Sequence, residues 1–214
     1  MIDTAVIFCG GYGSRLGSIT RKIPKPMVMV NGKPFLEHLL IQLRENNIKK
    51  VFLLVGYKKN KIVNYFKNGK KIGLKIEYSY NPPEYETGYR LNYIKDKIKK
   101  DFFILYCDNY CPINFSKNYS FFKNKKSLLC LSVVKKKNGN ISFNKYNKIK
   151  YSLVRNVKNN YVEIGYIIAK KNFLKNLTDE NIKLSKYFIK KNIKKKIDGL
   201  KLLNDYLSIS DKKR

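Results

Sequence analysis

The 214-residue chain has no tryptophan, one histidine and four cysteines. His38 and the cysteines Cys9, Cys107, Cys111 and Cys130 show no metal-ligand spacing such as C-x-x-C. A zinc or redox site is therefore not predicted, and the thiols are expected to be buried and reduced. The apolar runs are too short to span a bilayer, and no basic leader precedes an apolar stretch at the N-terminus. We expect a cytoplasmic protein without a membrane partner.

Acidic residues are also scarce, with 15 Asp and Glu against 46 Lys and Arg and a net charge of +31. Such an excess is typical of proteins that bind nucleic acid. However, only six of the 46 basic residues are arginines, and the lysines are spread through every segment. This distribution favours a solvated basic surface that attracts polyanionic substrates. A nucleic-acid-binding protein remains an alternative.

Strand-like and helix-like patterns alternate over the first 110 residues. The ranges 4–9, 49–56, 74–80 and 101–107 are predicted strands, and the ranges 34–47, 59–68 and 89–98 are predicted helices. Residues 81–88 are predicted to form a loop because Pro82 and Pro83 interrupt any regular element. This order favours an α/β fold with a mostly parallel sheet, which binds ligands beyond the carboxyl ends of its strands.

The pattern changes from about residue 127. The ranges 127–134, 139–154 and 161–169 are predicted to form strands joined by short turns, with Asn138 and Gly139 as a hairpin signal. Lysine-rich helices are expected near 171–177 and 182–192. Since no linker or repeat divides the chain, we predict a single domain, 1–214.

A glycine-rich turn follows the first predicted strand, in the stretch "CGGYGSRLGSITRKIPKPM". Leu16 stands where a G-x-G-x-x-G dinucleotide fingerprint needs glycine, and the G-K-[ST] of a P-loop is absent. The glycines let backbone N–H groups approach oxyanions closely. Arg15 adds a planar fork for two phosphate oxygens, and Lys25, between Pro24 and Pro26, adds a positioned charge. Two cations of this kind suit chemistry on a polyphosphate.

The motif G-G-Y-G-S-R-L, followed by "IPKPMVMVNGKPFLEHLL", resembles the signature of the sugar-1-phosphate nucleotidyltransferases, especially bacterial heptose- or hexose-1-phosphate guanylyltransferases. The resemblance is tight over residues 4–43 and weak after about residue 115. It implies a Rossmann-like three-layer fold with a mixed, mostly parallel central sheet. It also implies a nucleotide-binding part at 1–115 and a sugar-binding part at 116–214. The partners would be an NTP and a sugar 1-phosphate.

The resemblance also implies roles for individual residues. The triphosphate would be bound by the glycine turn, and Lys25 would neutralise the reacting phosphates. Asp108 would hold Mg²⁺ against the α-phosphate, so that Arg15, Lys25 and Asp108 form the catalytic group. Thr87 and Gly88 would contact the base, and Glu163 and Gly165 the sugar. The residues of the triphosphate-binding turn are Gly10, Gly11, Gly13, Ser14 and Arg15.

Three positions depart from this family pattern. Cys107 stands where a glycine normally precedes the metal-binding aspartate. Tyr89 and Arg90 replace small residues in the base-contacting turn, which predicts a narrower pocket or an altered base preference. Ser208 occupies the position of a second metal-binding aspartate, and Asp205 or Asp211 could replace it only if the chain shifted by three residues.

The sequence therefore predicts an enzyme that activates a sugar phosphate for glycan synthesis, with GTP favoured by similarity alone. A cytidylyltransferase acting on another phosphorylated acceptor uses the same loop chemistry. The missing carboxylate would also suit a relative that binds nucleotide without turnover. The oligomeric state stays open, a homo-oligomer included.

Overall fold

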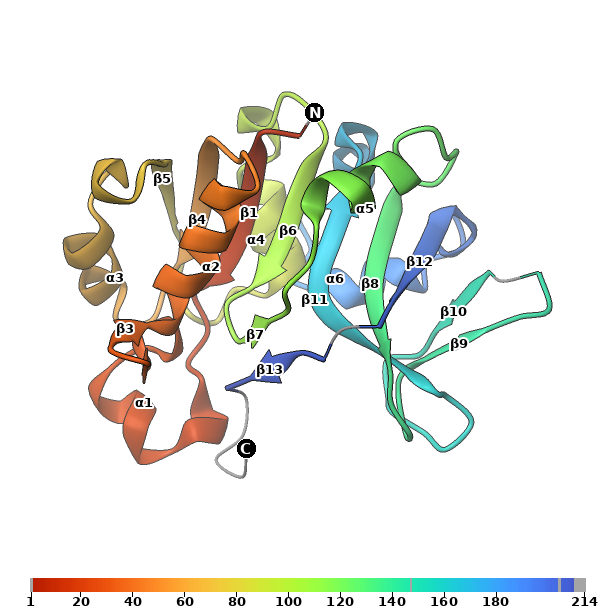
Figure 1. The fold of residues 1–214 in the computed structure, drawn as a ribbon, viewed down its shortest axis with the longest axis horizontal. Helices are drawn as coiled ribbons and strands as arrows, with labels where there is room; N and C mark the ends of the chain where they lie inside the picture. The colour runs from red at the N-terminus through yellow and green to blue at the C-terminus, as the bar shows by residue number, and fades with distance from the viewer. Residues whose placement is uncertain (1, 147, 204, 210–214) are drawn as a thin grey trace.

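The computed structural model describes residues 2–146, 148–203 and 205–209. Their centre is a nine-stranded sheet with the path β10-β9-β11-β6-β1-β4-β5, in which β8 pairs with β11 and β12 pairs with β8 (Figure 1). The strands of this sheet are β1 (Thr4–Cys9), β4 (Lys50–Val55), β5 (Lys75–Tyr80), β6 (Phe102–Tyr106), β8 (Leu129–Lys135), β9 (Ile141–Phe143), β10 (Ile149–Tyr151), β11 (Tyr161–Ala169) and β12 (Ile197–Leu202).

The first four of these strands form the parallel part of the sheet. β1 pairs in parallel with β4 on one side and β6 on the other, and β4 pairs in parallel with β5. β11 then pairs antiparallel with both β6 and β8, while β12 runs parallel to β8. The predicted mixed, mostly parallel sheet is confirmed.

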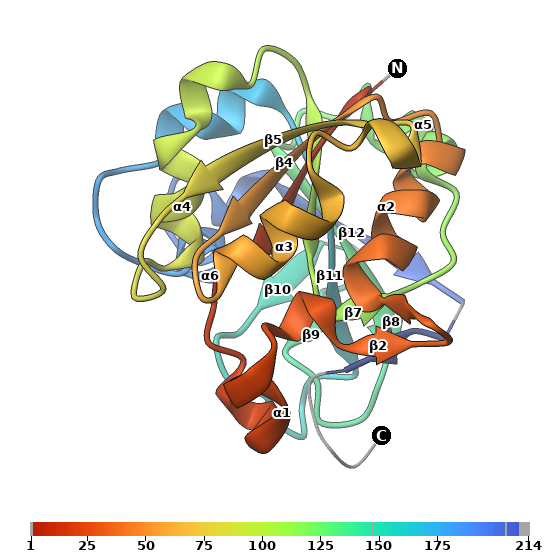
Figure 2. The same cartoon turned by 90° about the vertical axis from the view of Figure 1, so that its left-hand side faces the viewer.

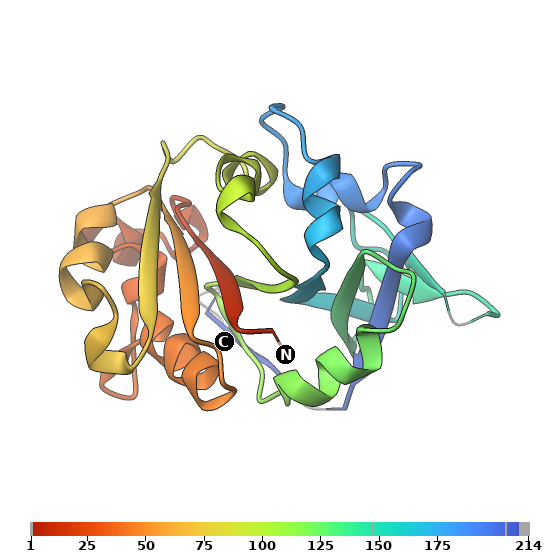
Figure 3. The same ribbon diagram turned by 90° about the horizontal axis from the view of Figure 1, so that it is seen from above.

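Helices cover both faces of the sheet. Residues of β1 alternate between two cores: Ala5 and Ile7 pack with α2, α3 and α5, whereas Val6 and Phe8 pack with α4 and α6. Figures 2 and 3 show the sheet between these two layers. The three-layer α/β architecture predicted from the sequence is therefore present. The helices are α1 (Ser18–Lys22), α2 (Phe35–Glu45), α3 (Lys59–Phe66), α4 (Thr87–Tyr93), α5 (Phe115–Phe122) and α6 (Leu184–Phe188).

Shorter elements lie around this framework. Two-residue strands form the pairs β2 (Met29–Val30) with β3 (Lys33–Pro34) and β7 (Asn109–Tyr110) with β13 (Leu207–Ser208). The 3₁₀ turns are η1 (Ser14–Leu16), η2 (Lys25–Met27), η3 (Lys70–Ile72), η4 (Lys95–Lys97), η5 (Lys171–Asn176) and η6 (Lys194–Lys196). η1 and η2 hold the basic residues singled out in the sequence.

Some predicted elements are wrong in detail. Asn138 and Gly139 form no hairpin, because the strands on either side of them, β8 and β9, do not pair with each other. Both pair with β11, and β9 also forms an antiparallel pair with β10. The helix expected near 171–177 is the 3₁₀ turn η5, and the one expected at 182–192 shortens to α6. α4 begins at Thr87, inside the predicted loop, and β12 was not predicted.

The cysteines are buried as expected, and the structure adds two further observations. All four cysteines are free and buried, and Nε2 of His38 lies 2.8 Å from the Val30 carbonyl oxygen, as suits a structural residue. Among the described residues, no helix has the length and apolar character needed to cross a membrane. The proposed division at residue 115 and the oligomeric state stay predictions.

Candidate active site

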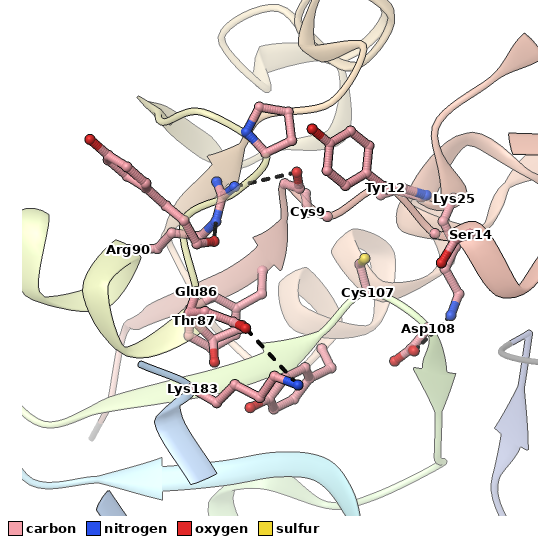
Figure 4. A pocket seen from close by; sticks show the side chains of 18 of the residues that line it. Cys9, Tyr12, Ser14, Lys25, Glu86, Thr87, Arg90, Cys107, Asp108 and Lys183 are labelled. Atoms are coloured by element: carbon pink, nitrogen blue, oxygen red, sulfur yellow. Dashed lines mark hydrogen bonds and ion pairs between the residues drawn. The ribbon is translucent and has the colours of Figure 1, made fainter. Parts of the chain in front are cut away.

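A cleft of ≈ 520 Å³ lies beyond the carboxyl ends of β1 and β6 (Figure 4). One wall is the glycine turn that follows β1, and the opposite wall is the segment 83–87 that leads into α4. Lys25 and Asp108 lie at one end of the cleft. The crevice beyond the carboxyl ends of parallel strands is the usual ligand site of an open α/β sheet.

The glycine turn is held against Lys25. Gly13 has φ +67°, and a Cβ atom there would lie 3.0 Å from Cβ of Lys25 and 3.1 Å from Cγ2 of Thr20. The Thr20 hydroxyl donates to the carbonyl oxygens of Gly13 at 3.2 Å and Gly17 at 3.1 Å. A side chain at position 13 would therefore strain the backbone and push the turn away from the lysine.

Two cations meet one carboxylate at one end of the cleft. Nζ of Lys25 lies 2.8 Å from Oδ2 of Asp108, and Nη2 of Arg15 lies 4.0 Å from the same oxygen. The side chain of Lys25 is only 9% exposed, whereas that of Arg15 is 65% exposed. The structure thus brings together the three residues predicted to be catalytic. An excess of one positive charge in a partly dry cleft attracts an anion.

Thr87 and Gly88 lie on the opposite wall but face different neighbours. Thr87 lines the cleft, and its hydroxyl oxygen accepts a hydrogen bond from the Leu184 N–H at 2.8 Å. Gly88 is buried behind it, where its N–H donates to the Ile182 carbonyl oxygen at 2.9 Å. A Cβ atom on Gly88 would lie 2.5 Å from that oxygen, so this glycine permits close packing of the two segments.

Glu163 and Gly165 lie on β11. They do not line the cleft, but they lie beside Tyr106, which does. The β11 pairing is irregular between Glu163 and Ile167, and Gly165 has φ +80°. The Gly165 N–H donates to the Glu163 carboxylate. Burial raises the pKa of Glu163 to about 7, although this hydrogen bond lowers it, and the charge of Asp108 adds to the rise. The carboxyl group is therefore partly protonated near neutral pH.

Several lining residues were missed by the sequence analysis. Nζ of Lys183 lies 4.0 Å from Oε1 of Glu86, and the Tyr12 hydroxyl donates to Glu84 across the two walls. Lys183 is one lysine in a lysine-rich segment, so no sequence signal distinguished it. Tyr12 lies within the glycine motif, but the motif does not indicate where the tyrosine ring lies.

The departures at Cys107 and Arg90 have structural explanations. Cys107 lines the cleft next to Cys9, and burial, followed by the contact with Cys107, raises the pKa of Cys9 well above its ordinary value. The Cys9 thiol is therefore protonated and unreactive at neutral pH. Arg90 is buried, and its guanidinium donates to backbone carbonyls on both walls of the cleft.

The C-terminal strand β13 lies next to the predicted metal-binding residue. Ser208 pairs with Asn109, and the Ile209 N–H donates to the Asp108 carbonyl oxygen at 2.9 Å. The carbonyl of Asp205 instead approaches Sγ of Cys111. The register therefore places Ser208, and not Asp205, opposite Asn109, the residue that follows Asp108. Asp211 lies outside the described residues.

The residues fit a Mg²⁺ ion that is shared with a substrate. Among the described residues, no group of three His, Cys, Asp or Glu could hold a metal ion. However, Mg²⁺ commonly uses one or two protein carboxylates, with phosphates and water as its other ligands. The Asp108 carboxylate lies beside the glycine turn, where such phosphates would bind.

Several known proteins are similar to this chain in sequence. The "Nucleotidyl transferase" family model matches residues 4–209. A D-glycero-alpha-D-manno-heptose 1-phosphate guanylyltransferase of Campylobacter jejuni is 39% identical over 129 residues, 60% of this chain and 56% of that protein. The bifunctional protein GlmU of Methanococcus maripaludis is 43% identical over 101 residues, 47% of this chain and 23% of GlmU. The chain thus matches only part of each relative.

The fold is shared more widely than the sequence. The crystal structure of HddC from Yersinia pseudotuberculosis complexed with GMP-PN has a TM-score of 0.80 and 20% sequence identity, covering 99% of this chain and 95% of that one. At this identity the likeness shows the fold alone. The match to the family model over residues 4–209 shows that the chain belongs to the nucleotidyl transferase family.

Proposed function

We propose that the protein transfers a nucleoside monophosphate from an NTP to a sugar 1-phosphate and releases pyrophosphate. The observation that carries this proposal is the meeting of Arg15, Lys25 and Asp108 beside the glycine turn. A polyphosphate between the turn and these cations would contact backbone N–H groups and two positive charges. The family match and the guanylyltransferase relative support the same reaction class.

The reaction needs no nucleophilic side chain. An oxygen of the sugar phosphate attacks the α-phosphorus, a new P–O bond forms, and the bond from that phosphorus to the bridging oxygen of the leaving pyrophosphate breaks. Lys25 neutralises charge that builds on the α-phosphoryl oxygens, and Arg15 binds the pyrophosphate. The attacking oxygen of the sugar phosphate is already deprotonated, and pyrophosphate leaves as an anion. No general base is therefore required.

Asp108 is the residue that would hold Mg²⁺ in this cleft. When bound, the ion supplies further positive charge to the phosphates and helps to fix their orientation. The Lys25 ammonium at 2.8 Å keeps the Asp108 carboxylate in place. This contact accounts for the buried position of Lys25 without requiring a separate structural role.

GTP is the proposed donor, and a heptose or hexose 1-phosphate the proposed acceptor. Two observations support these substrates: the heptose 1-phosphate guanylyltransferase relative of Campylobacter jejuni and the sequence resemblance. Glu163 and Gly165 are the proposed sugar contacts, through the face of β11 beside Tyr106. A role in glycan synthesis follows from this substrate class.

A second candidate is a nucleotide-binding relative without turnover. One observation favours it: Ser208, which the sequence resemblance aligns with a second metal-binding aspartate, pairs with Asn109 and carries no carboxylate. Such a protein would bind an NTP and release no pyrophosphate. The two candidates therefore differ in a single measurable product.

The test is pyrophosphate release with Mg²⁺ from GTP, CTP, UTP and dTTP, each offered with a panel of sugar 1-phosphates. We expect release with one base and one sugar, and its loss in Asp108→Asn. The exposed-site variant Asp96→Asn, outside the cleft, serves as the matched control. NTP binding without release from any pair would establish the second candidate, and no NTP binding at all would contradict both.

A further inference from the structure

Arg90 makes an unusual set of contacts for a buried cation. Its residue surface is only 2% exposed. Nε donates to the Tyr85 carbonyl at 2.7 Å, and Nη1 donates to the Val55 carbonyl at 3.1 Å. Nη2 donates to the carbonyls of Pro82 at 2.6 Å and Gly10 at 3.3 Å. All four acceptors are backbone oxygens.

These oxygens belong to three separate segments. Gly10 follows β1, Val55 ends β4, and Pro82 and Tyr85 belong to the segment between β5 and α4. Among the described residues, Arg90 forms no ion pair with a carboxylate. Its direct contacts are with carbonyl dipoles, and the charges of Glu84 and Glu86 nearby also favour the charged form. A buried guanidinium is costly unless its donors are satisfied, and here at least four of five N–H groups are. The arrangement joins both walls of the cleft through one side chain.

Two glycines make room for this guanidinium. A Cβ atom on Gly10 would lie 2.1 Å from Nη1 of Arg90. A Cβ atom on Gly56 would lie 2.9 Å from Nη2 and 2.6 Å from the Gly10 carbonyl oxygen. Any larger residue at either position would displace Arg90 or separate the strand ends. Gly10, the first glycine of the motif, therefore leaves room for Arg90 as well as letting phosphate oxygens approach the backbone.

We propose that Arg90 is a positioning residue that fixes the distance between the glycine turn and the 82–87 segment, and thereby sets nucleotide affinity and base discrimination. This inference rests on the proposed function, because it assumes that the base lies between these two walls. Figure 4 shows Arg90 at the opposite end of the cleft from Lys25 and Asp108. Arg90 therefore acts on binding of the nucleoside and not on the chemical step.

Lysine cannot replace this arrangement. The guanidinium is planar and presents its donors in a fixed fork, so it reaches oxygens on several sides at once. An ammonium group keeps the charge but concentrates its donors at one point, and it would satisfy only part of the set. Without this fixed spacing, the two walls become ordered only when the nucleotide binds. The free energy spent on this ordering weakens binding.

The test compares Arg90→Lys and Arg90→Met with wild type and with Arg44→Lys, an exposed arginine on α2 outside the cleft. The measurements are the Kd of each NTP by calorimetry, kcat and KM for pyrophosphate release, and thermal unfolding. We expect both Arg90 variants to raise the NTP Kd and KM about tenfold or more, with kcat changed less than about threefold. The preference for one base over another falls by a similar factor, and Arg44→Lys changes none of these.

Gly56→Ala provides a second variant should Arg90 variants fail to fold. It keeps the arginine and pushes on Nη2 and the Gly10 carbonyl, so it is expected to raise KM in the same way. Unchanged KM and base preference in folded Arg90→Lys or in Gly56→Ala would overturn the inference, as would an equal loss of kcat and kcat/KM. An active wild type with unaffected variants contradicts only this inference. A wild type that binds no NTP contradicts the proposed function and the inference together.

Discussion

Lys25 and Asp108 are far apart in the sequence, yet their charged atoms lie 2.8 Å apart. Lys25 begins the 3₁₀ turn η2, after Pro24 in an extended conformation. Asp108 follows β6, which pairs directly with β1. The backbone therefore positions the lysine, and the sheet positions the aspartate. A lysine with a fixed location can stabilise a developing charge without first reorganising.

Replacing Lys25 by alanine is expected to lower kcat by about 10²- to 10³-fold, because one preorganised cation is lost from the reacting phosphates. The change in KM for the NTP should be smaller, since the glycine turn and Arg15 remain. Steady-state pyrophosphate release measures both constants. Lys22→Ala, at an exposed position on α1, is the matched control and should keep full activity. Equal effects of the two substitutions would remove Lys25 from the catalytic group.

Glu163 predicts a specific dependence of stability on pH. Its pKa rises from 4.5 to about 7 on folding, chiefly through burial. Between these values the folded state binds more protons at this site than the unfolded state does. The contribution to stability is therefore greatest at low pH and is lost as pH rises from 4.5 to 7. This sign is opposite to that of a salt-bridged carboxylate.

Glu163→Gln should remove this dependence, because the amide oxygen still accepts the Gly165 N–H while no proton is bound or released. From pH 4.5 to pH 8, the unfolding free energy of the variant should rise by about 1–3 kcal/mol relative to that of wild type. Urea unfolding at both pH values measures it. Glu180→Gln, at an exposed position, should follow wild type. A parallel pH profile for Glu163→Gln would show that folding does not raise the pKa of Glu163.

At the scale of elements, the short pair β7–β13 decides which C-terminal residues lie beside the segment that follows Asp108. Ser208 pairs with Asn109, and its neighbour Leu207 pairs with Tyr110 and is 68% exposed. The two positions are thus a natural comparison for the effect of an added carboxylate.

Ser208→Asp is expected to bind Mn²⁺ about tenfold more tightly than wild type in the absence of nucleotide, because a second oxygen ligand joins Asp108. Electron paramagnetic resonance of free Mn²⁺ measures this affinity directly and does not depend on turnover. Leu207→Asp adds the same charge one residue away, opposite Tyr110, and should leave the affinity near that of wild type. Equal gains in both variants would indicate a general charge effect and would place the metal elsewhere.

The elements that the sequence predicted well are those with strong local patterns. Helix α2 carries Phe35, Leu39, Leu40 and Leu43 at helical spacing, and all four are buried. β12 was missed because its residues "IDGLKL" follow a lysine run and contain Asp198 and Gly199, which are rare in strands. Pairing with β8 over six residues determines this strand, and such long-range pairing leaves little local signal.

The candidate site was predicted in the same uneven way. The glycine turn, Lys25 and Asp108 belong to short motifs beside predicted strand ends, so their meeting could be inferred from topology. Arg90 was recognised as a departure, but its contacts involve three segments that approach one another only in the folded sheet. Predicting its role would have required the register of β1 against β4.

At the scale of the whole molecule, the net charge of +31 raises the nucleic-acid alternative again. Binding through phosphate contacts spread over a basic surface weakens steeply with salt, by about 10³-fold or more between 50 and 200 mM for six to ten contacts. An NTP in the cleft is held by a few partly buried groups, which salt screens much less. Salt therefore separates the two kinds of binding on one protein.

We expect duplex DNA to inhibit pyrophosphate release at 50 mM salt and to have little effect at 200 mM, where turnover itself falls by less than about threefold. The assay adds DNA at fixed NTP and sugar phosphate and varies only the salt. Replacing the exposed η6 lysines Lys194, Lys195 and Lys196 by alanine should reduce the inhibition at 50 mM and leave turnover unchanged, since they lie outside the cleft. Inhibition that persists at 200 mM, or that depends on the DNA sequence, would instead support a dedicated nucleic-acid site.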